Sequence, residues 1–192
     1  PEQFLRTCSG QAQEKLADIR RHLHAGAAAP TNEEVRSEIK HRMSMHGAFL
    51  RSAEGVEEAL AGARRLRDTI TDQGIRIEAK TDLNRAFQNQ HLCLTHIAFL
   101  ETIRAYIERG GGSRGGYLIQ DPEGELSVQT KKGTELPHRP ENMEMREEIL
   151  ETVLGADGEF EVRPVERRPL PEDESWYETT WDEWRQGRIF RK

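Results

Sequence analysis

The chain has 192 residues, of which 35% are hydrophobic and 32% charged, and its formal net charge is -6. This length suits one domain, or one domain with a long tail. The acidic balance predicts no nucleic-acid partner, because contacts to phosphate need a basic surface, and the lack of an 18-residue apolar run predicts no transmembrane segment.

The chain contains two cysteines, Cys8 and Cys93, whose positions give neither a disulfide framework nor a metal-binding spacing. Cys93 lies in an apolar helical stretch, so we expect it to be a buried free thiol. Free thiols are typical of a reducing compartment, which predicts a cytoplasmic protein. Because the sequence starts at Pro1 and shows no leader, we expect it to be a fragment of a longer chain.

Residues 1–30 are predicted to form an N-terminal helix and a connector. Apolar residues recur at helical spacing as far as Leu23, and Ser9 is a candidate helix cap. The sequence AGAAAP, which ends at Pro30, then interrupts the pattern and is typical of a connecting segment.

Residues 31–121 are predicted to form a helical bundle domain. Its first helix starts with a capping box made by Thr31 and Glu34, and its second helix follows Ser52 and closes at Gly74. The predicted inward faces repeat every three or four residues. They consist of Val35, Ile39, Met43, His46 and Leu50 in the first helix, and Val56, Leu60, Ala63, Leu66 and Ile70 in the second.

A third helix is predicted to begin at Thr81 or Asp82 and to run for about seven turns to Ile107. Apolar residues occur around much of its circumference, which is typical of a helix surrounded by neighbours. We therefore predict a mostly α fold, built as a three-helix up-down bundle with this third helix at its centre.

Residues 122–192 are predicted to form an extended segment with an appended β-hairpin and a long C-terminal arm. Two strand-like runs lie between Ile149 and Val165, and the Asp157-Gly158 pair between them is a hairpin signal.

The C-terminal arm is predicted to be a tryptophan-rich contact surface. Tyr177, Trp181 and Trp184 are spaced so that they share one face of a short helix. Because exposed aromatic clusters usually mark interaction sites, we expect this arm to dock on another surface, in the same polypeptide or on a partner.

No motif for catalysis or metal binding emerges from the sequence. The histidine pairs lie two or five residues apart, whereas helical metal ligands lie three or four apart and so share one face. No G-x-S-x-G element is present, and Cys93 has no neighbouring group that would activate it. We therefore predict that this chain alone carries no catalytic, cofactor-binding or metal-binding residues.

The sequence RGGGSRGG, from Arg109 to Gly116, follows the third predicted helix. It can end that helix, with Gly110 in the left-handed conformation and arginines near the last carbonyls. It can also bind RNA, as segments of arginine, glycine and aromatic residues do, although a single copy in an acidic chain is a weak signal. A phosphate-binding loop is disfavoured, because such a loop precedes a helix and this one follows it.

Three segments, in this order, resemble one known family: RSAEGVEEALAGARRL (residues 51–66), the long helix of residues 82–109, and SRGGYLIQD (residues 113–121). With the later Asp157-Gly158 and Arg163-Pro164-Val165, they resemble the C-terminal helical domain of the succinate dehydrogenase/fumarate reductase flavoprotein family. The resemblance extends over residues 34–165.

Within this resemblance, Ser113, Arg114, Gly115 and Asp121 match the Ser-Arg-Gly and the final Asp of the family's motif. The sequence also departs from that motif, with Gly112 in place of Glu, Gly116 of Ala, Tyr117 of His and Ile119 of Arg. These departures remove much of the polar network of the family's turn. They put the family's usual substrate, a four-carbon dicarboxylate, in question.

The resemblance implies a full-length protein that binds FAD in an N-terminal Rossmann-type domain, with this chain packed on that domain. It also implies an iron–sulfur or other electron-transfer subunit as a further partner, in the cytoplasm or at the inner face of the membrane. On this basis, Arg114 should pair with an acceptor in the missing domain or with Asp121, and Ser113 should bond the free helix carbonyls. The domain-interface candidates are Ser113, Arg114, Gly115, Asp121, Trp181 and Trp184.

Two other functions are compatible with the sequence. The chain can be a stand-alone helical interaction module that holds a protein partner through Trp176, Trp181 and Trp184. It can also be an RNA-binding protein, in which case its retention on RNA would depend on salt. Upstream coding sequence with a dinucleotide fingerprint would exclude the first of these alternatives.

Overall fold

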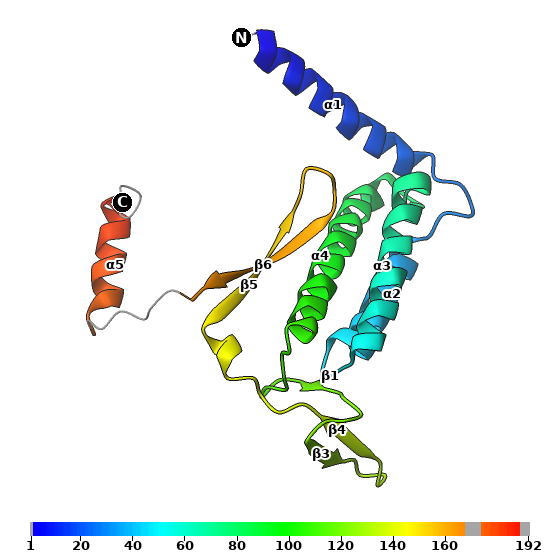
Figure 1. The fold of residues 1–192 in the computed structure, drawn as a ribbon. Helices are drawn as coiled ribbons and strands as arrows, with labels where there is room; N and C mark the ends of the chain where they lie inside the picture. Colours follow the sequence, from blue (N-terminus) through cyan, green and yellow to red (C-terminus); the bar gives the residue numbers. More distant parts are fainter. Residues whose placement is uncertain (1, 168–173, 189–192) are drawn as a thin grey trace.

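The computed structural model describes residues 2–167 and 174–188, and these residues form a mostly α protein with three small two-stranded sheets (Figure 1). Within this part of the chain, no helix is both long and apolar enough to cross a bilayer. The α-helices are α1 (Glu2–Leu23), α2 (Asn32–Arg42), α3 (Ala53–Gln73), α4 (Leu83–Glu108) and α5 (Trp176–Arg185). The strands are β1 (Leu50–Arg51), β2 (Leu118–Ile119), β3 (Leu126–Gln129), β4 (Glu135–His138), β5 (Glu148–Leu154) and β6 (Phe160–Glu166).

Helix α4 lies at the centre of the packing. It contacts α1, α2, α3 and both strands of the β5–β6 hairpin, which lies alongside it (Figure 1). One buried cluster joins α3 and the C-terminal half of α4, with Leu60, Ile97 and Leu100 fully covered. A second cluster joins α2, α3 and the N-terminal half of α4, around Val35 and Ile75. These contacts confirm that the fold is mostly α, and α4 packs against several elements, although Phe99 on its outer side is 58% exposed.

The predicted caps of α2 and α3 are confirmed. Thr31 Oγ1 accepts a hydrogen bond from the Glu34 N–H at 3.2 Å, and the Glu34 carboxylate accepts from the Thr31 N–H at 2.7 Å. Ser52 Oγ accepts from the Gly55 N–H at 3.1 Å. Gly74 ends α3 with φ of +76°, a conformation that glycine adopts without strain. Local sequence chemistry therefore sets both helix starts and the end of α3.

The prediction that one helix continues to Leu50 is wrong. Helix α2 ends at Arg42, and a π-helix, η1 (Met43–Gly47), follows it. Leu50 and Arg51 instead form β1, which pairs in parallel with β2. Pairing with β2 extends the backbone here, and Arg51 Nε donates to the Gly47 and Ala48 carbonyl oxygens at the end of the π-helix.

Two further differences from the sequence prediction concern α1 and the segment after α4. Ser9 is not a cap, because α1 already begins at Glu2. The segment after Asp121 contains a hairpin that periodicity did not reveal, in which β3 and β4 pair antiparallel around Gly133, whose φ is +80°. Its four-residue strands are too short for a clear alternating pattern.

The second hairpin, β5–β6, was predicted from the Asp157-Gly158 turn and forms there. Gly155 N–H donates to Glu159 O at 2.8 Å, and Gly158 has φ of +83°. The antiparallel register pairs Leu154 with Phe160 beside the turn. One face of β5 turns toward α4, where the hydroxyls of Thr152 and Thr102 lie 2.6 Å apart. This hydrogen bond, together with the contacts of both strands with α4, holds the hairpin against the helix.

Two buried histidines occupy different environments. His22, at the end of α1, accepts from the Ile75 N–H through Nδ1 at 2.9 Å and lies 3.2 Å from Gln90 Oε1 through Nε2. His96, on α4, is only 3% exposed, and both of its ring nitrogens lack a hydrogen-bond partner. Burial, and then the positive charge of Arg42, lower the pKa of His96 to about 4.

His96 should make the chain sensitive to acid. Its folded-state pKa lies below its ordinary value of 6.5, so protonation favours the unfolded chain and stability should fall between pH 6.5 and about 4. The loss is of the order of 2 kcal/mol, allowing for partial screening. We expect His96→Leu to make the free energy of unfolding in urea depend less on pH across that range. His41→Gln, at an exposed histidine, is the control and should keep the wild-type pH dependence. The same pH dependence in wild type and His96→Leu would contradict the prediction.

Candidate functional site

The short β1–β2 pair positions the glycine-rich segment that follows α4. The Leu118 N–H donates to Phe49 O, and the Gln120 N–H donates to Arg51 O, both at 2.7 Å. The connection between α2 and α3 is therefore tied to the chain that returns from the C-terminal end of α4. We call residues 109–121 the glycine turn.

The first part of the glycine turn closes α4, as the sequence predicted. Gly110 has φ of +81°, and the Gly111 N–H donates to Tyr106 O at 2.8 Å. Tyr106 Oη then donates to Gly112 O at 2.9 Å. Arg109 pairs with Glu148 on the hairpin, so its charge contacts a carboxylate rather than only the helix end. This chain's own packing therefore requires a tight turn at residues 110–112.

The five glycines of the turn fall into two groups. A Cβ on Gly111 would lie 2.4 Å from the Tyr106 ring, and one on Gly112 would lie 1.6 Å from Pro140 O, so no side chain fits at either position. A Cβ on Gly115 or Gly116 would meet nothing within 4 Å, and neither residue has a positive φ. The structure thus explains Gly110, Gly111 and Gly112, but nothing in the described part of the chain requires glycine at residues 115 and 116.

Three predicted site residues come together in the glycine turn, but their partners differ from those expected. Asp121 pairs with Arg139, whose Nε lies 2.6 Å from Asp121 Oδ2, and not with Arg114. Arg114 instead pairs with Glu141 at 3.1 Å. Ser113 was expected to bond the helix carbonyls, but the side-chain bond it makes in the described part of the chain is with Ile119, whose N–H donates to Ser113 Oγ at 3.0 Å.

Arg139 explains these differences. The chain after β4 runs beside the turn, with the Arg139 N–H donating to Ile119 O at 3.0 Å. From there, Arg139 Nη1 reaches the last turn of α4 and donates to Ile107 O at 3.1 Å. The Arg139 hydrogen bond is the main cause that lowers the pKa of Asp121. Sequence analysis missed Arg139, because the β3–β4 hairpin that delivers it was not recognised.

A small hollow lies beside the turn, with a volume of 260 Å³. Arg51 stacks over the Tyr117 ring at 4.0 Å, and Tyr106 meets Tyr117 edge-on with 6.0 Å between ring centres. Burial is the main cause that raises the pKa of Tyr106 to about 12, so this phenol stays protonated at neutral pH. Arg114 also lines the hollow, whereas the next predicted interface residue, Gly115, is exposed on the loop.

The structure does not bring the predicted tail residues to the glycine turn. Trp181 and Trp184 stack on α5 with ring centres 5.1 Å apart, and they are 47% and 50% exposed. Figure 1 shows α5 apart from the central helices. The described residues leave these rings half exposed, so docking of the arm elsewhere in the polypeptide or on a partner stays a prediction.

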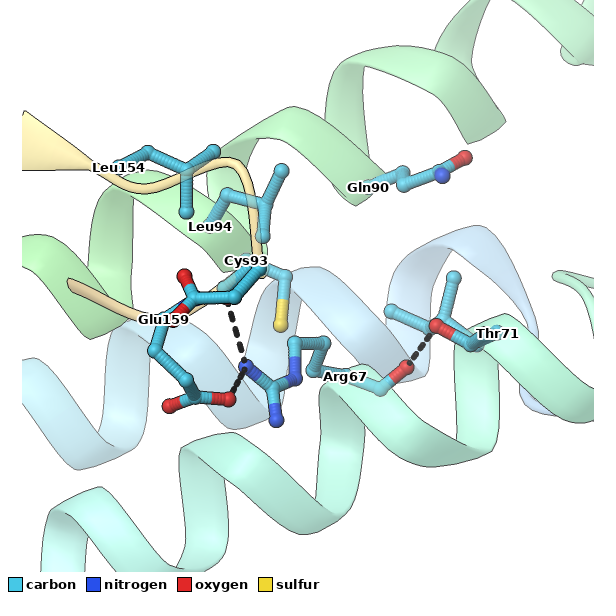
Figure 2. Close-up of a pocket in the computed structure, with 10 residues that line it drawn as sticks. Arg67, Thr71, Gln90, Cys93, Leu94, Leu154 and Glu159 are labelled. Carbon is cyan, nitrogen blue, oxygen red and sulfur yellow. Dashed lines mark hydrogen bonds and ion pairs between the residues drawn. The ribbon is translucent and has the colours of Figure 1, made fainter. Parts of the chain in front are cut away.

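A larger hollow, of 390 Å³, lies between α3, α4 and the tip of the β5–β6 hairpin (Figure 2). We call it the hairpin pocket. Its lining residues are Arg67, Ile70, Thr71, Gln90, Cys93, Leu94, Leu154, Asp157, Gly158 and Glu159. Sequence analysis did not anticipate this pocket, because it forms only where the hairpin tip meets two helices.

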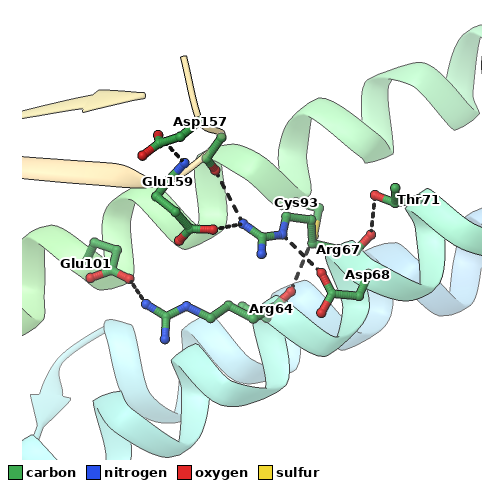
Figure 3. A network of polar contacts seen from close by, with 10 residues as sticks. Arg64, Arg67, Asp68, Thr71, Cys93, Glu101, Asp157 and Glu159 are labelled. Atoms are coloured by element: carbon green, nitrogen blue, oxygen red, sulfur yellow. Dashed lines mark hydrogen bonds and ion pairs between the residues drawn. The ribbon is translucent and has the colours of Figure 1, made fainter. Parts of the chain in front are cut away.

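Polar contacts join the hairpin tip to the helices (Figure 3). Arg67 Nη1 lies 3.4 Å from Glu159 Oε1 and 3.5 Å from Gly158 O, and Arg67 Nε lies 3.3 Å from Asp68 Oδ1. Nearby, Arg64 pairs with the buried Glu101 of α4.

Cys93 is the buried free thiol that the sequence predicted, with 1% exposure. Its Sγ lies 3.8 Å from Ala63 O on α3. Burial raises the pKa of Cys93 to about 11, so little thiolate exists at neutral pH.

Among the residues that the structure describes, no group of three or more histidine, cysteine or acidic side chains is arranged to hold a metal ion. No protein-family model matches the sequence. No curated protein and no solved structure matches it either. The proposals below therefore depend on the residues and on their geometry.

Gly112→Ala should destabilise the chain, because its Cβ would overlap the Pro140 carbonyl and force the backbone to move. We expect a loss of about 1–3 kcal/mol in chemical unfolding. The matched control is Gly116→Ala in the same turn, which should change stability by no more than about 1 kcal/mol and in the stabilising direction. Equal losses for the two variants would show that the turn is not packed as described.

The two cysteines should differ sharply in reactivity. Cys8 is exposed, whereas Cys93 is buried with a raised pKa, so iodoacetamide should modify Cys8 at least about 100-fold faster at neutral pH. Mass spectrometry of the alkylated peptides measures both rates in one sample. In denaturing urea the two rates should converge. Rapid modification of Cys93 in the folded chain would contradict its placement.

Proposed function

We propose that this chain is the C-terminal helical domain of an FAD-dependent oxidoreductase that resembles the succinate dehydrogenase/fumarate reductase flavoproteins. Its role is to pack on a flavin-binding domain, and it catalyses no reaction alone. In this proposal α2, α3 and α4 are the up-down bundle of residues 31–121. Residues 1–30 and 122–192 supply the N-terminal helix, the hairpins and the C-terminal arm.

The observation that carries this proposal is the open space at Gly115 and Gly116. Glycine is needed where a backbone has positive φ or where another group approaches closely. Among residues 2–167 and 174–188 neither condition holds at these two positions, and both residues are exposed. A surface from outside the chain that lies directly against this loop would leave no room for a Cβ and would therefore explain both glycines.

Apolar groups next to the loop support the same surface. Phe49 is 60% exposed, and its carbonyl holds Leu118, so its ring lies on the segment that flanks the glycine turn. Met45, on the π-helix just before it, is 57% exposed. Large exposed apolar side chains beside a glycine loop are typical of a contact surface. The turn also presents the half-exposed Arg114, which can pair across an interface.

The glycine turn itself does not fit the pyrophosphate of FAD. Phosphate groups bind where helix N-termini direct N–H groups at them, but this turn follows the C-terminal end of α4, where carbonyls point outward. The proposal therefore assigns FAD to the other domain and not to residues of this chain. Ser113, Arg114, Gly115 and Asp121 then act at the domain interface, Asp121 through its contact with Arg139.

A second function, that of a helical module that holds a protein partner through its C-terminal arm, is favoured by a separate observation. Trp176, Trp181 and Trp184 on α5 are each about half exposed, at 45%, 47% and 50%. Aromatic side chains in one short helix are frequent anchors in protein interfaces. In the flavoprotein, the same arm would contact the electron-transfer subunit or the flavin domain.

The test is the double variant Gly115→Ala/Gly116→Ala in the complete gene product. We expect a loss of bound flavin, or of dye-coupled reductase activity, of at least about tenfold, because two added methyl groups would push the domains apart. The visible absorption of bound flavin measures the first quantity. The same substitutions in the 192-residue chain should leave its unfolding midpoint unchanged or slightly higher.

Gly26→Ala is the matched control, because its Cβ also meets nothing within 4 Å but lies in the connector between α1 and α2. This variant should keep full flavin content. If the complete gene product carries no flavin in any variant, the flavoprotein assignment is wrong. If flavin is present and the double variant retains it with full activity, the domain interface does not lie at the glycine turn.

A further inference from the structure

The hairpin pocket is lined by both apolar and polar side chains. Ile70 and Cys93 are 2% and 1% exposed and form its floor, and Leu94 and Leu154 line its sides. Asp157 and Glu159, at the hairpin tip, also line it, and Glu159 lies near Arg67 in Figure 2. Small-molecule sites typically combine apolar side chains with a few polar groups that fix the ligand.

Arg67 is the cation of this pocket, and its guanidinium is held only loosely. Its three contacts, to Asp68, Glu159 and Gly158 O, are 3.3, 3.4 and 3.5 Å long. Each of these distances exceeds the 2.7–2.9 Å of a strong charge-assisted hydrogen bond.

Two other arginines of the chain show what a satisfied pair looks like. Arg163 contacts Glu151 Oε2 through Nε at 2.8 Å and Nη2 at 2.6 Å. Arg146 contacts the two oxygens of Glu141 at 3.0 and 2.8 Å. Arg67 makes no such pair, although its side chain is only 24% exposed. It therefore retains the capacity for a bidentate pair with another carboxylate.

We propose that the hairpin pocket binds a small carboxylate with an apolar body, such as a medium-length monocarboxylate. The ligand's carboxylate pairs with Arg67 and displaces Glu159. Its apolar part lies on Ile70, Cys93, Leu94 and Leu154. The chain's own Glu159 then acts as a competitor that occupies Arg67 when the pocket holds no ligand.

Among the remaining groups of the pocket, Gln90 can donate to a carboxylate. Its Oε1 is already bound by His22, which leaves the Gln90 amide group as a donor. The Thr71 hydroxyl already donates to Arg67 O and Asp157 is itself a carboxylate, so neither contributes a donor, and Arg67 must supply the main contact. A bare inorganic anion would leave the apolar floor without a partner. The 390 Å³ volume falls in the range of small-molecule sites.

The test uses hexanoate, its uncharged counterpart hexanamide, and acetate, which lacks the apolar chain. Titration calorimetry gives their affinities for the purified protein, and amide shifts of Thr71, Gln90 and Leu94 locate the site. We expect hexanoate to bind at least about tenfold more tightly than either of the other probes. Equal affinities for hexanoate and hexanamide, or no detectable binding of hexanoate, would overturn the proposal.

Two variants separate ligand binding from loosening of the hairpin. Arg67→Met and Glu159→Gln both remove the Arg67–Glu159 ion pair, so a purely structural effect would act on both in the same direction. The proposal requires opposite results: Arg67→Met should weaken hexanoate binding at least about tenfold, and Glu159→Gln should strengthen it a few-fold.

Arg65→Met is the matched control, because Arg65 is exposed on α3 outside this pocket and should leave the affinity unchanged. Weaker binding in both Arg67→Met and Glu159→Gln would overturn the proposal, as would an equal loss in Arg65→Met. The experiment does not depend on flavin, so its outcome is separate from that of the flavoprotein proposal.

Discussion

The burial of α4 is the constraint on which both candidate sites depend. Its inward side chains pack against α2 and α3, and the β5–β6 hairpin contacts it as well, whereas Phe99 on its outer side is 58% exposed. The hairpin pocket lies over its N-terminal half, where Cys93 and Leu94 lie, and the glycine turn begins at its C-terminal end. Ile97 and Leu100, between them, are fully buried, so loss of this packing would displace both sites together.

The glycine turn shows how one sequence feature can serve two purposes. Gly111 and Gly112 are needed because Tyr106 and the Pro140 carbonyl lie where their side chains would be. Gly115 and Gly116 meet no such contact, and the loop between Arg114 and Tyr117 projects from the surface. The same run of glycines thus ends a helix by internal packing and continues into an exposed loop whose glycines the described residues do not explain. This division separates what the chain explains alone from what the domain-interface proposal must explain.

Sequence reasoning succeeded where the structure is determined locally. The caps at Thr31, Ser52, Gly74 and Gly110 depend on neighbouring residues, so the sequence predicts them directly. The Asp157-Gly158 hairpin is local in the same sense. Contacts between distant segments could not be predicted this way. Nothing near Asp121 in the sequence indicates Arg139 as its partner, and nothing near Arg67 indicates Glu159.

The prediction for the end of α2 was wrong for a related reason. The helical periodicity continues to Leu50, but pairing of β1 with the distant β2 extends the backbone there. His96 is a different kind of exception, because its position on α4 predicts burial but not the absence of partners. Tertiary contacts decide both cases against local preference.

The β5–β6 hairpin physically connects the two candidate sites. At its base, Glu148 pairs with Arg109 at the start of the glycine turn, and at its tip Glu159 contacts Arg67 in the hairpin pocket. Thr152 bonds Thr102 of α4 between these two points. A carboxylate that displaced Glu159 would release the tip while the base and middle stayed fastened. Its effect would therefore be confined to the pocket end of the hairpin, and the glycine turn would keep its geometry whether or not the pocket is filled.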